Sequence, residues 1–111
     1  MIFVHGGISV KVAKEYGSIK TLEEKGKNLD FSKQSEIFGD AGPLWYRGHS
    51  TGTEDCYNLE FILDKLNAGY MVMGHTIKSQ ITARCDNKAL LIDTGISRHL
   101  NNRLSAIEIF Q

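Results

Sequence analysis

Short apolar runs that stop at histidine or glycine are the clearest feature of the hydrophobic pattern. Residues 1–4 form one such run, which ends at His5, and residues 70–73 form another, which ends at Gly74. A continuous apolar run of this length, bounded by turn residues, is typical of a strand buried on both faces. The pattern therefore predicts two buried strands, each followed by a glycine-containing loop.

One segment between these runs has helical periodicity. Its apolar residues recur at helical spacing and share one face: Leu59, Ile62, Leu63 and Leu66. Thr53 is the predicted N-cap, and Gly69 is the predicted end of the helix. A shorter helix is predicted over residues 9–16, stopped by Gly17.

The other segments give weaker signals. Residues 21–34 are polar and predict a solvated loop with marginal helix, whereas residues 44–46 predict a short extended segment. Residues 81–85 and 89–92 flank a turn-like tripeptide and predict a hairpin. Residues 104–110 predict a last strand that is covered on both sides, since both of its faces are mostly apolar.

Composition places the chain among ordinary globular proteins. Its 111 residues suffice for a single small domain, and its formal net charge of zero gives no reason to expect a nucleic acid or an anionic membrane as partner. No apolar run approaches the roughly 20 residues that a membrane span needs. Cys56 and Cys85 form neither a C-x-x-C pair nor a dense framework. We therefore expect two reduced thiols in an intracellular protein.

Two histidines occupy the ends of predicted strands. His5 and His75 each lie beside glycine just after a buried strand. Open α/β sheets bind ligands at the carboxyl ends of their strands, and two imidazoles there can ligate one cation. The alternative is that each histidine makes a structural hydrogen bond. The residues alone leave both interpretations open.

Arg47 is the candidate for binding an anion. It follows the aromatic residues Trp45 and Tyr46, and a guanidinium can grip a phosphoryl group with two parallel hydrogen bonds. Alternatively, it is a surface arginine packed on an aromatic ring. If the segment is extended, Arg47 and Tyr46 face opposite ways and Tyr46 is the more packed of the two.

Three further polar residues are weaker candidates for a functional site. His49 lies close to Arg47 in the sequence and is a possible lining residue, whereas His99 lies in a polar segment and is predicted to be solvated. Asp93 is predicted to be a polar strand end that bonds nearby backbone amides.

Five short motifs follow one another along the chain: Val-His-Gly-Gly-Ile, Gly-Pro-Leu-Trp-Tyr-Arg-Gly, Gly-His-Thr, Ile-Asp-Thr-Gly-Ile-Ser and Ser-Ala-Ile-Glu-Ile. In this order they resemble the second half of the phosphoprotein phosphatase superfamily, and most closely its Shewanella-like branch. The resemblance covers residues 3–109. It implies an α+β fold, namely half of a calcineurin-like four-layer αββα sandwich with mixed β-sheets.

The resemblance also implies a chemistry. In such enzymes a metal-activated hydroxide hydrolyses a phosphomonoester, without a phosphoenzyme. By analogy, His5 and His75 would be ligands of a divalent metal ion (manganese, iron or zinc), and Arg47 would hold the phosphate of a phosphorylated protein or small molecule. These roles are expectations carried over from the family.

The motifs of the family's first half (Asp-x-His, Gly-Asp-x-x-Asp-Arg-Gly and Gly-Asn-His-Glu) do not occur in the sequence. Residues 1–111 are therefore expected to form a single partial domain whose metal site needs ligands from a partner chain or a missing N-terminal half. We expect the isolated chain to be inactive, and to be oligomeric, aggregation-prone or part of a larger assembly. The alternative function is a catalytically inactive structural or interaction subunit derived from such a phosphatase. An unrelated binding module is disfavoured by the number of motifs that match.

Overall fold

The computed structural model describes residues 1–28 and 36–110. Its elements, in chain order, are β1 (Ile2–Val4), α1 (Val10–Tyr16), α2 (Ile19–Lys27), a 3₁₀ turn (Glu36–Phe38), α3 (Gly48–Thr51), α4 (Cys56–Lys65), β2 (Met71–Met73), β3 (Thr82–Arg84) and β4 (Ala89–Leu91). The fold is thus α+β, as the sequence predicts.

The four strands form one mixed sheet in the order β1-β2-β4-β3. β1 pairs with β2 in parallel, β2 pairs with β4 in parallel, and β3 pairs with β4 antiparallel. The two predicted buried strands are therefore neighbours, and the predicted hairpin is confirmed. Because β1 and β2 run the same way, their carboxyl ends lie at the same edge of the sheet.

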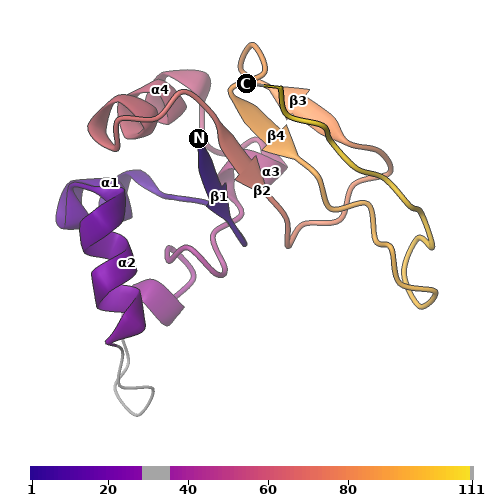
Figure 1. The fold of residues 1–111 in the computed structure, drawn as a ribbon, viewed down its shortest axis with the longest axis horizontal. Coiled ribbons are helices and arrows are strands. Elements are labelled where there is room, and N and C mark those ends of the chain that lie inside the picture. The colour runs from indigo at the N-terminus through magenta and orange to yellow at the C-terminus, as the bar shows by residue number, and fades with distance from the viewer. Residues whose placement is uncertain (29–35, 111) are drawn as a thin grey trace.

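One face of the sheet packs against α1 and α4 (Figure 1). Alternate strand residues point to this face and are buried with the apolar stripe of the helices: Ile2, Met71, Met73, Ala89, Leu91, Val12, Ala13, Leu59, Ile62, Leu63 and Leu66. On the opposite face, Phe3, Val72 and Leu90 lie in register across three strands. Phe3 is 66% exposed, so part of this apolar row is uncovered among the described residues.

The two predicted helices differ in how well their ends were placed. The predicted end of α1 at Gly17 is confirmed, since Gly17 lies in the left-handed region, and Ser9 caps the other end by accepting a hydrogen bond from the Val12 amide. For α4, the predicted cap Thr53 is wrong, because the Asp55 carboxylate accepts from the Asn58 amide instead. The predicted end at Gly69 is also late, since the helix closes before Leu66.

Two further local predictions are wrong. Residues 19–27 form a regular helix, α2, capped by Ser18, where a solvated loop with only marginal helix was predicted from residue 21 onward. The remainder of that predicted loop, residues 29–35, lies outside the described residues. Residues 44–46 belong to a turn, in which the amides of Trp45 and Tyr46 donate to the Gly42 carbonyl, and are not a strand.

The predicted last strand, residues 104–110, is not formed. This segment has no ladder pairing and runs back alongside β3 and β4 (Figure 1). Leu104 and Phe110 are 81% and 84% exposed. The hydroxyl of Thr94 donates to the Arg103 carbonyl and contacts the Ser105 hydroxyl, which holds the start of the segment. Its apolar pattern is that of a covered strand, but the described chain supplies no strand to pair with it.

The expectation of two reduced cysteines is wrong. Cys56, the first residue of α4, is joined by a disulfide to Cys85, which directly follows β3. Their Cα atoms are 5.4 Å apart, within the usual range for a disulfide. The fold brings together two residues separated by 29 positions, which spacing alone does not reveal. The intracellular location inferred from free thiols loses that support.

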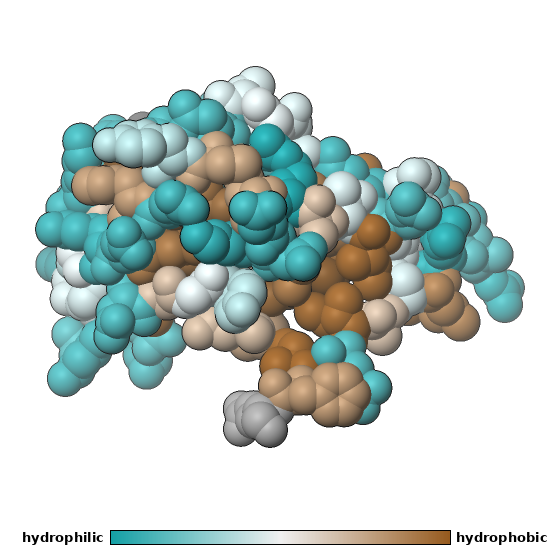
Figure 2. Space-filling view, turned by 90° about the horizontal axis from the view of Figure 1, so that it is seen from above, coloured by the Kyte–Doolittle hydropathy of each residue, from teal (hydrophilic) through white to brown (hydrophobic). Residues whose placement is uncertain are grey.

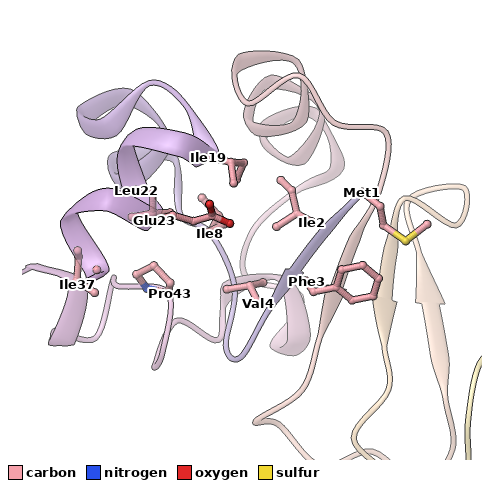
Figure 3. A pocket seen from close by; sticks show the side chains of 11 residues that line it. Met1, Ile2, Phe3, Val4, Ile8, Ile19, Leu22, Glu23, Ile37 and Pro43 are labelled. Carbon is pink, nitrogen blue, oxygen red and sulfur yellow. The ribbon is translucent and has the colours of Figure 1, made fainter. Parts of the chain in front are cut away.

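A mostly apolar cavity of about 370 Å³ lies between β1 and α2 (Figure 3). Val4, Ile8, Leu22 and Pro43 are among its lining residues, and Glu23 adds a carboxylate. The cavity opens beside β1, which is an edge strand of the sheet. Unfilled apolar space next to an unpaired strand edge is a surface that a further segment can cover.

Apolar side chains also reach the surface between two largely polar regions (Figure 2). Large exposed apolar residues come from several parts of the chain, including Met1, Trp45, Ile96 and Leu100. Within residues 1–28 and 36–110, no helix combines the length and apolar character that crossing a membrane requires.

Candidate functional site

The paired strands β1 and β2 bring His5 and His75 together, as predicted. The amide of Gly74 donates to the His5 carbonyl at 2.9 Å, which joins the two loops directly beyond the strands. The two imidazole ring centroids are 4.7 Å apart, with their planes tilted by 52°. Two residues separated by 70 positions in the sequence thus form one pair at the carboxyl edge of the sheet.

His75 is held in an unusual local environment. Its backbone has φ of 65°, in the left-handed region that non-glycine residues seldom adopt. Its Nε2 is buried and has no hydrogen-bond partner among the described residues. Burial lowers the pKa of His75, and the charges of Arg47 and His5 lower it further. The lowered pKa favours the neutral imidazole, whose Nε2 is left unpaired among the described residues.

The loop before α3 is clamped against the loop that carries His5. The amides of Gly6 and Gly7 both donate to the Pro43 carbonyl, at 2.7 and 3.2 Å. A Cβ atom on Gly6 would lie 2.9 Å from the Leu44 carbonyl oxygen and 3.0 Å from that of Pro43. Glycine is required at this position because the two backbones pass too close for any side chain.

We predict that Gly6→Ala destabilises the fold by about 1–3 kcal/mol, because the contacting backbone atoms have no easy way to move. Gly26→Ala, within α2, is the matched control, since a Cβ there meets no atom within 4 Å. Alanine favours a helix over glycine, so this control is expected to be neutral or slightly stabilising. Urea denaturation of both variants measures the difference in stability. Equal urea midpoints would contradict the close approach of the Gly6 backbone to the Pro43 and Leu44 carbonyls.

Arg47 lies next to the second histidine. Its Nη1 donates to the Thr76 hydroxyl at 2.8 Å and to the His75 carbonyl at 3.3 Å. The side chain is exposed, whereas Tyr46 is half-buried, so the predicted difference in packing is confirmed. A guanidinium carries five N–H groups, and those not used by Thr76 and His75 remain for an anion.

His49 is a structural residue in this fold. It is 2% exposed, and its Nε2 lies 2.7 Å from the Ile8 carbonyl, to which the neutral ring donates. Its ring also meets Tyr46 edge-on. The hydrogen bond to Ile8 ties α3 to the segment that follows His5. The possibility that His49 lines the site is therefore not supported.

His49 makes stability depend on pH. Burial lowers the pKa of its ring below the usual value, so protonation is easier in the unfolded chain than in the folded one. The neutral ring therefore contributes stability above about pH 6.5, and this contribution is lost as the pH falls. We predict that the free energy of unfolding decreases from about pH 7 to about pH 5, and that His49→Gln weakens this dependence. The exposed His99, changed to glutamine, is the control; an unaltered pH profile in His49→Gln would contradict the assignment.

The other two polar residues behave as predicted. The Asp93 carboxylate accepts a hydrogen bond from the Gly95 amide at 3.0 Å, so it caps the turn after β4. His99 is exposed to solvent. Among the described residues, neither side chain forms a hydrogen bond with the histidine pair, although the charge of Asp93 raises the pKa of His75.

A cavity of about 400 Å³ opens beside the histidine pair. It is lined by His5 and His75 together with Leu44 and Trp45. The Trp45 ring meets His75 edge-on, with centroids 5.1 Å apart. The pair therefore faces a partly apolar hollow, with Arg47 on the backbone side of His75.

Known proteins are similar to this chain in sequence and in fold. Shewanella-like protein phosphatase 1 of Plasmodium berghei is 33% identical over 114 residues, covering 91% of this chain and 32% of the relative. The cold-active protein-tyrosine phosphatase of a psychrophilic Shewanella species superposes with a TM-score of 0.73 at 29% identity, over 85% of this chain and 31% of that structure. The chain is homologous to part of the Shewanella-like protein phosphatases.

The matched region is only a portion of these relatives. An uncharacterised protein of Schizosaccharomyces pombe is 31% identical over 121 residues, which cover 98% of this chain and 36% of the relative. This chain thus spans about a third of the length of the curated relatives it matches. No family model matches the chain.

The calcineurin-like family to which the Shewanella-like phosphatases belong uses divalent metals, and the site here suits one in part. The unused Nε2 of His75, beside the His5 ring, is the donor type that zinc, iron and manganese accept. Two imidazoles are too few, because such ions take about four to six ligands. In the described part of the chain, no group of three or more histidine, cysteine, aspartate or glutamate residues is placed to hold a metal.

Sequence reasoning missed three residues that shape this site. Thr76 anchors the Arg47 guanidinium, and Lys78 and Arg84 bond carbonyl groups of α3. Thr76 lies within the Gly-His-Thr motif, which could have signalled it. Lys78 and Arg84 follow no motif, and their roles depend on contacts between segments far apart in the sequence.

Proposed function

We propose that this chain supplies part of the active site of a metal-dependent phosphoesterase, in which His5 and His75 are metal ligands and Arg47 binds phosphate. The observation that supports it best is the convergence of these three residues. The histidine rings lie 4.7 Å apart, and Arg47 is bonded to the backbone of one of them. The homology to Shewanella-like phosphatases supports the same reading.

Each residue has a chemical part in this proposal. The lowered pKa of His75 favours the neutral ring, which a metal ligand requires. Arg47 offers its remaining N–H groups to phosphate oxygens and offsets their charge. Divalent ions, when bound, lower the pKa of water and neutralise phosphate charge. Trp45 and Leu44 line the hollow beside the histidines and would contact the group that carries the phosphate.

The remaining ligands are proposed to come from a complementary polypeptide, whether a partner chain or a further part of the same protein. Three features support this. The relatives are about three times as long as the matched region. β1 is an edge strand with Phe3 exposed beside it. The cavity next to β1 is lined by apolar residues (Figure 3). The complementary part would cover this surface and complete the metal site.

The second candidate is a structural or interaction subunit without activity. It is favoured by one observation, namely that the described residues place no group of three or more histidine, cysteine, aspartate or glutamate side chains to hold a metal. In this alternative, the exposed apolar residues bind a partner, and the histidine pair is what remains of an ancestral metal site.

A zinc titration of the isotope-labelled chain, followed through the four histidine rings by NMR, tests the proposed site. We expect the ring signals of His5 and His75 to shift together, and those of the buried His49 and the exposed His99 to stay unchanged. Binding is expected to be weak, because two ligands are missing or supplied by water. Movement of the His99 signal alone would contradict the site.

A further inference from the structure

We propose that Arg84 is a positioning residue for Arg47, and that the Cys56–Cys85 disulfide keeps Arg84 in place. Reduction of the disulfide would then release the guanidinium of Arg47 from its ordered position. The inference rests on the proposed role of Arg47 in phosphate binding. The contacts that lead to it concern α3, the short helix directly after Arg47.

Two cations hold the carbonyl groups of α3. The Arg84 Nη1 donates to the His49 carbonyl, and the Lys78 Nζ donates to the Ser50 carbonyl at 2.5 Å. The guanidinium of Arg84 also packs near Gly52, which ends the helix: a Cβ atom placed there would lie 3.7 Å from Nη2. Positive groups satisfy the unpaired carbonyls at a helix C-terminus, so these contacts fix a helix too short to be stable alone.

The position of α3 determines the position of Arg47. The Arg47 carbonyl accepts hydrogen bonds from both the amide and the hydroxyl of Thr51, each at 2.9 Å. Arg47 is therefore the residue from which the helix starts. Its guanidinium reaches Thr76 from this anchored backbone. A shift of α3 would carry Arg47 away from the loop that holds His75.

The disulfide fixes the other end of this chain of contacts. Cys85 is covalently next to Arg84 and has φ of 56°, so the strand turns sharply there. Its bond to Cys56 ties the turn to the first residue of α4. α4 follows α3 in the sequence, so the disulfide ties the turn beside Arg84 to the helix that comes directly after α3.

The bond is open to reduction. Cys56 is exposed and Cys85 is partly exposed. A dithiol can attack one sulfur to form a mixed disulfide, and its second thiol then releases the protein thiol. The two electrons come from the dithiol, which becomes a cyclic disulfide, and the protein gains two thiols. With the bond open, the turn at Cys85 is no longer tied to α4 and Arg84 loses its fixed direction.

The test is NMR of the arginine side chains in the 111-residue chain, without metal or phosphate. In the oxidised protein we expect a distinct, slowly exchanging Nη–H signal for Arg47, since its Nη1 is hydrogen-bonded to the Thr76 hydroxyl and the His75 carbonyl. Adding a dithiol, or making Arg84→Gln, should move this signal to the position and exchange rate of free arginine. Arg84→Lys should restore part of the effect. Lys88→Gln on the same hairpin, which loses its pair with Glu60, should leave the Arg47 signal unchanged.

Several outcomes would overturn the inference. One is an unchanged Arg47 signal after mass spectrometry shows that two protons have been gained. A second is that the protein purified without a reductant has the mass of the form with two free thiols. A third is loss of the α1 and α4 amide signals together with that of Arg47, because the disulfide would then serve overall stability. The readout uses no ligand, so its failure is distinguishable from failure of the zinc titration.

Discussion

Replacing Arg47 with alanine is expected to lower phosphomonoesterase activity by about 100- to 1,000-fold, the usual cost of losing one donor that stabilises developing negative charge. The measurement requires a complete site. We therefore consider a graft in which this chain replaces the matching segment of the cold-active Shewanella phosphatase, which superposes on 85% of it. Hydrolysis of an aryl phosphate by the graft and by its Arg47→Ala form gives the ratio.

The controls for this prediction separate charge from geometry. Arg47→Lys keeps the charge but loses the planar fork, so its activity should fall between those of the graft and the alanine form. Arg98 is exposed, and Arg98→Ala should retain full activity. If Arg47→Ala leaves the rate within a factor of about two, Arg47 does not bind phosphate and is instead a surface arginine packed on an aromatic ring.

The second large effect is expected for His75→Ala in the same graft. Mutating a residue that only hydrogen-bonds a metal ligand typically lowers metal affinity or activity by about 10- to 100-fold. Removal of a ligand itself should therefore lower the activity by at least about 100-fold. The unused Nε2 and neutral ring of His75 are the reason for this assignment. His99→Ala is the matched control, since His99 is exposed to solvent.

Metal content distinguishes a ligand from a structural histidine. Metal analysis of the purified His75→Ala graft should show less bound metal than the unaltered graft, because a ligand has been removed. His5→Ala is expected to give the same result, because the two rings are neighbours. Full metal content together with lost activity would assign both histidines to another role.

The pairing of the site histidines could be predicted from the sequence. Two apolar runs ending in histidine and glycine indicate parallel strands, and parallel neighbours place their carboxyl ends together. The observed pairing of Phe3 with Val72 in β1 and β2 is the physical basis of that success. Local periodicity and a simple rule of sheet geometry sufficed.

Contacts between distant segments could not be predicted in this way. The disulfide joins residues 29 positions apart, and the bond from Arg84 to the His49 carbonyl spans 35 positions. Neither leaves a periodic signal. The failed strand over residues 104–110 has another cause, since its apolar pattern reflects a covering layer that the described chain does not supply. The apolar pattern of a segment indicates that it can be buried, but a strand forms only where another strand is present to pair with it.

The most direct test of the incomplete site compares two proteins in one assay: the 111-residue chain alone and the graft, each with added manganese and an aryl phosphate. We predict no turnover by the chain alone, because two imidazoles and one arginine do not complete a metal site, and metal-dependent turnover by the graft. Turnover by the chain alone, lost in its His75→Ala form, would show that the site needs no complementary part. A folded graft without turnover would contradict the proposed function and favour the structural subunit.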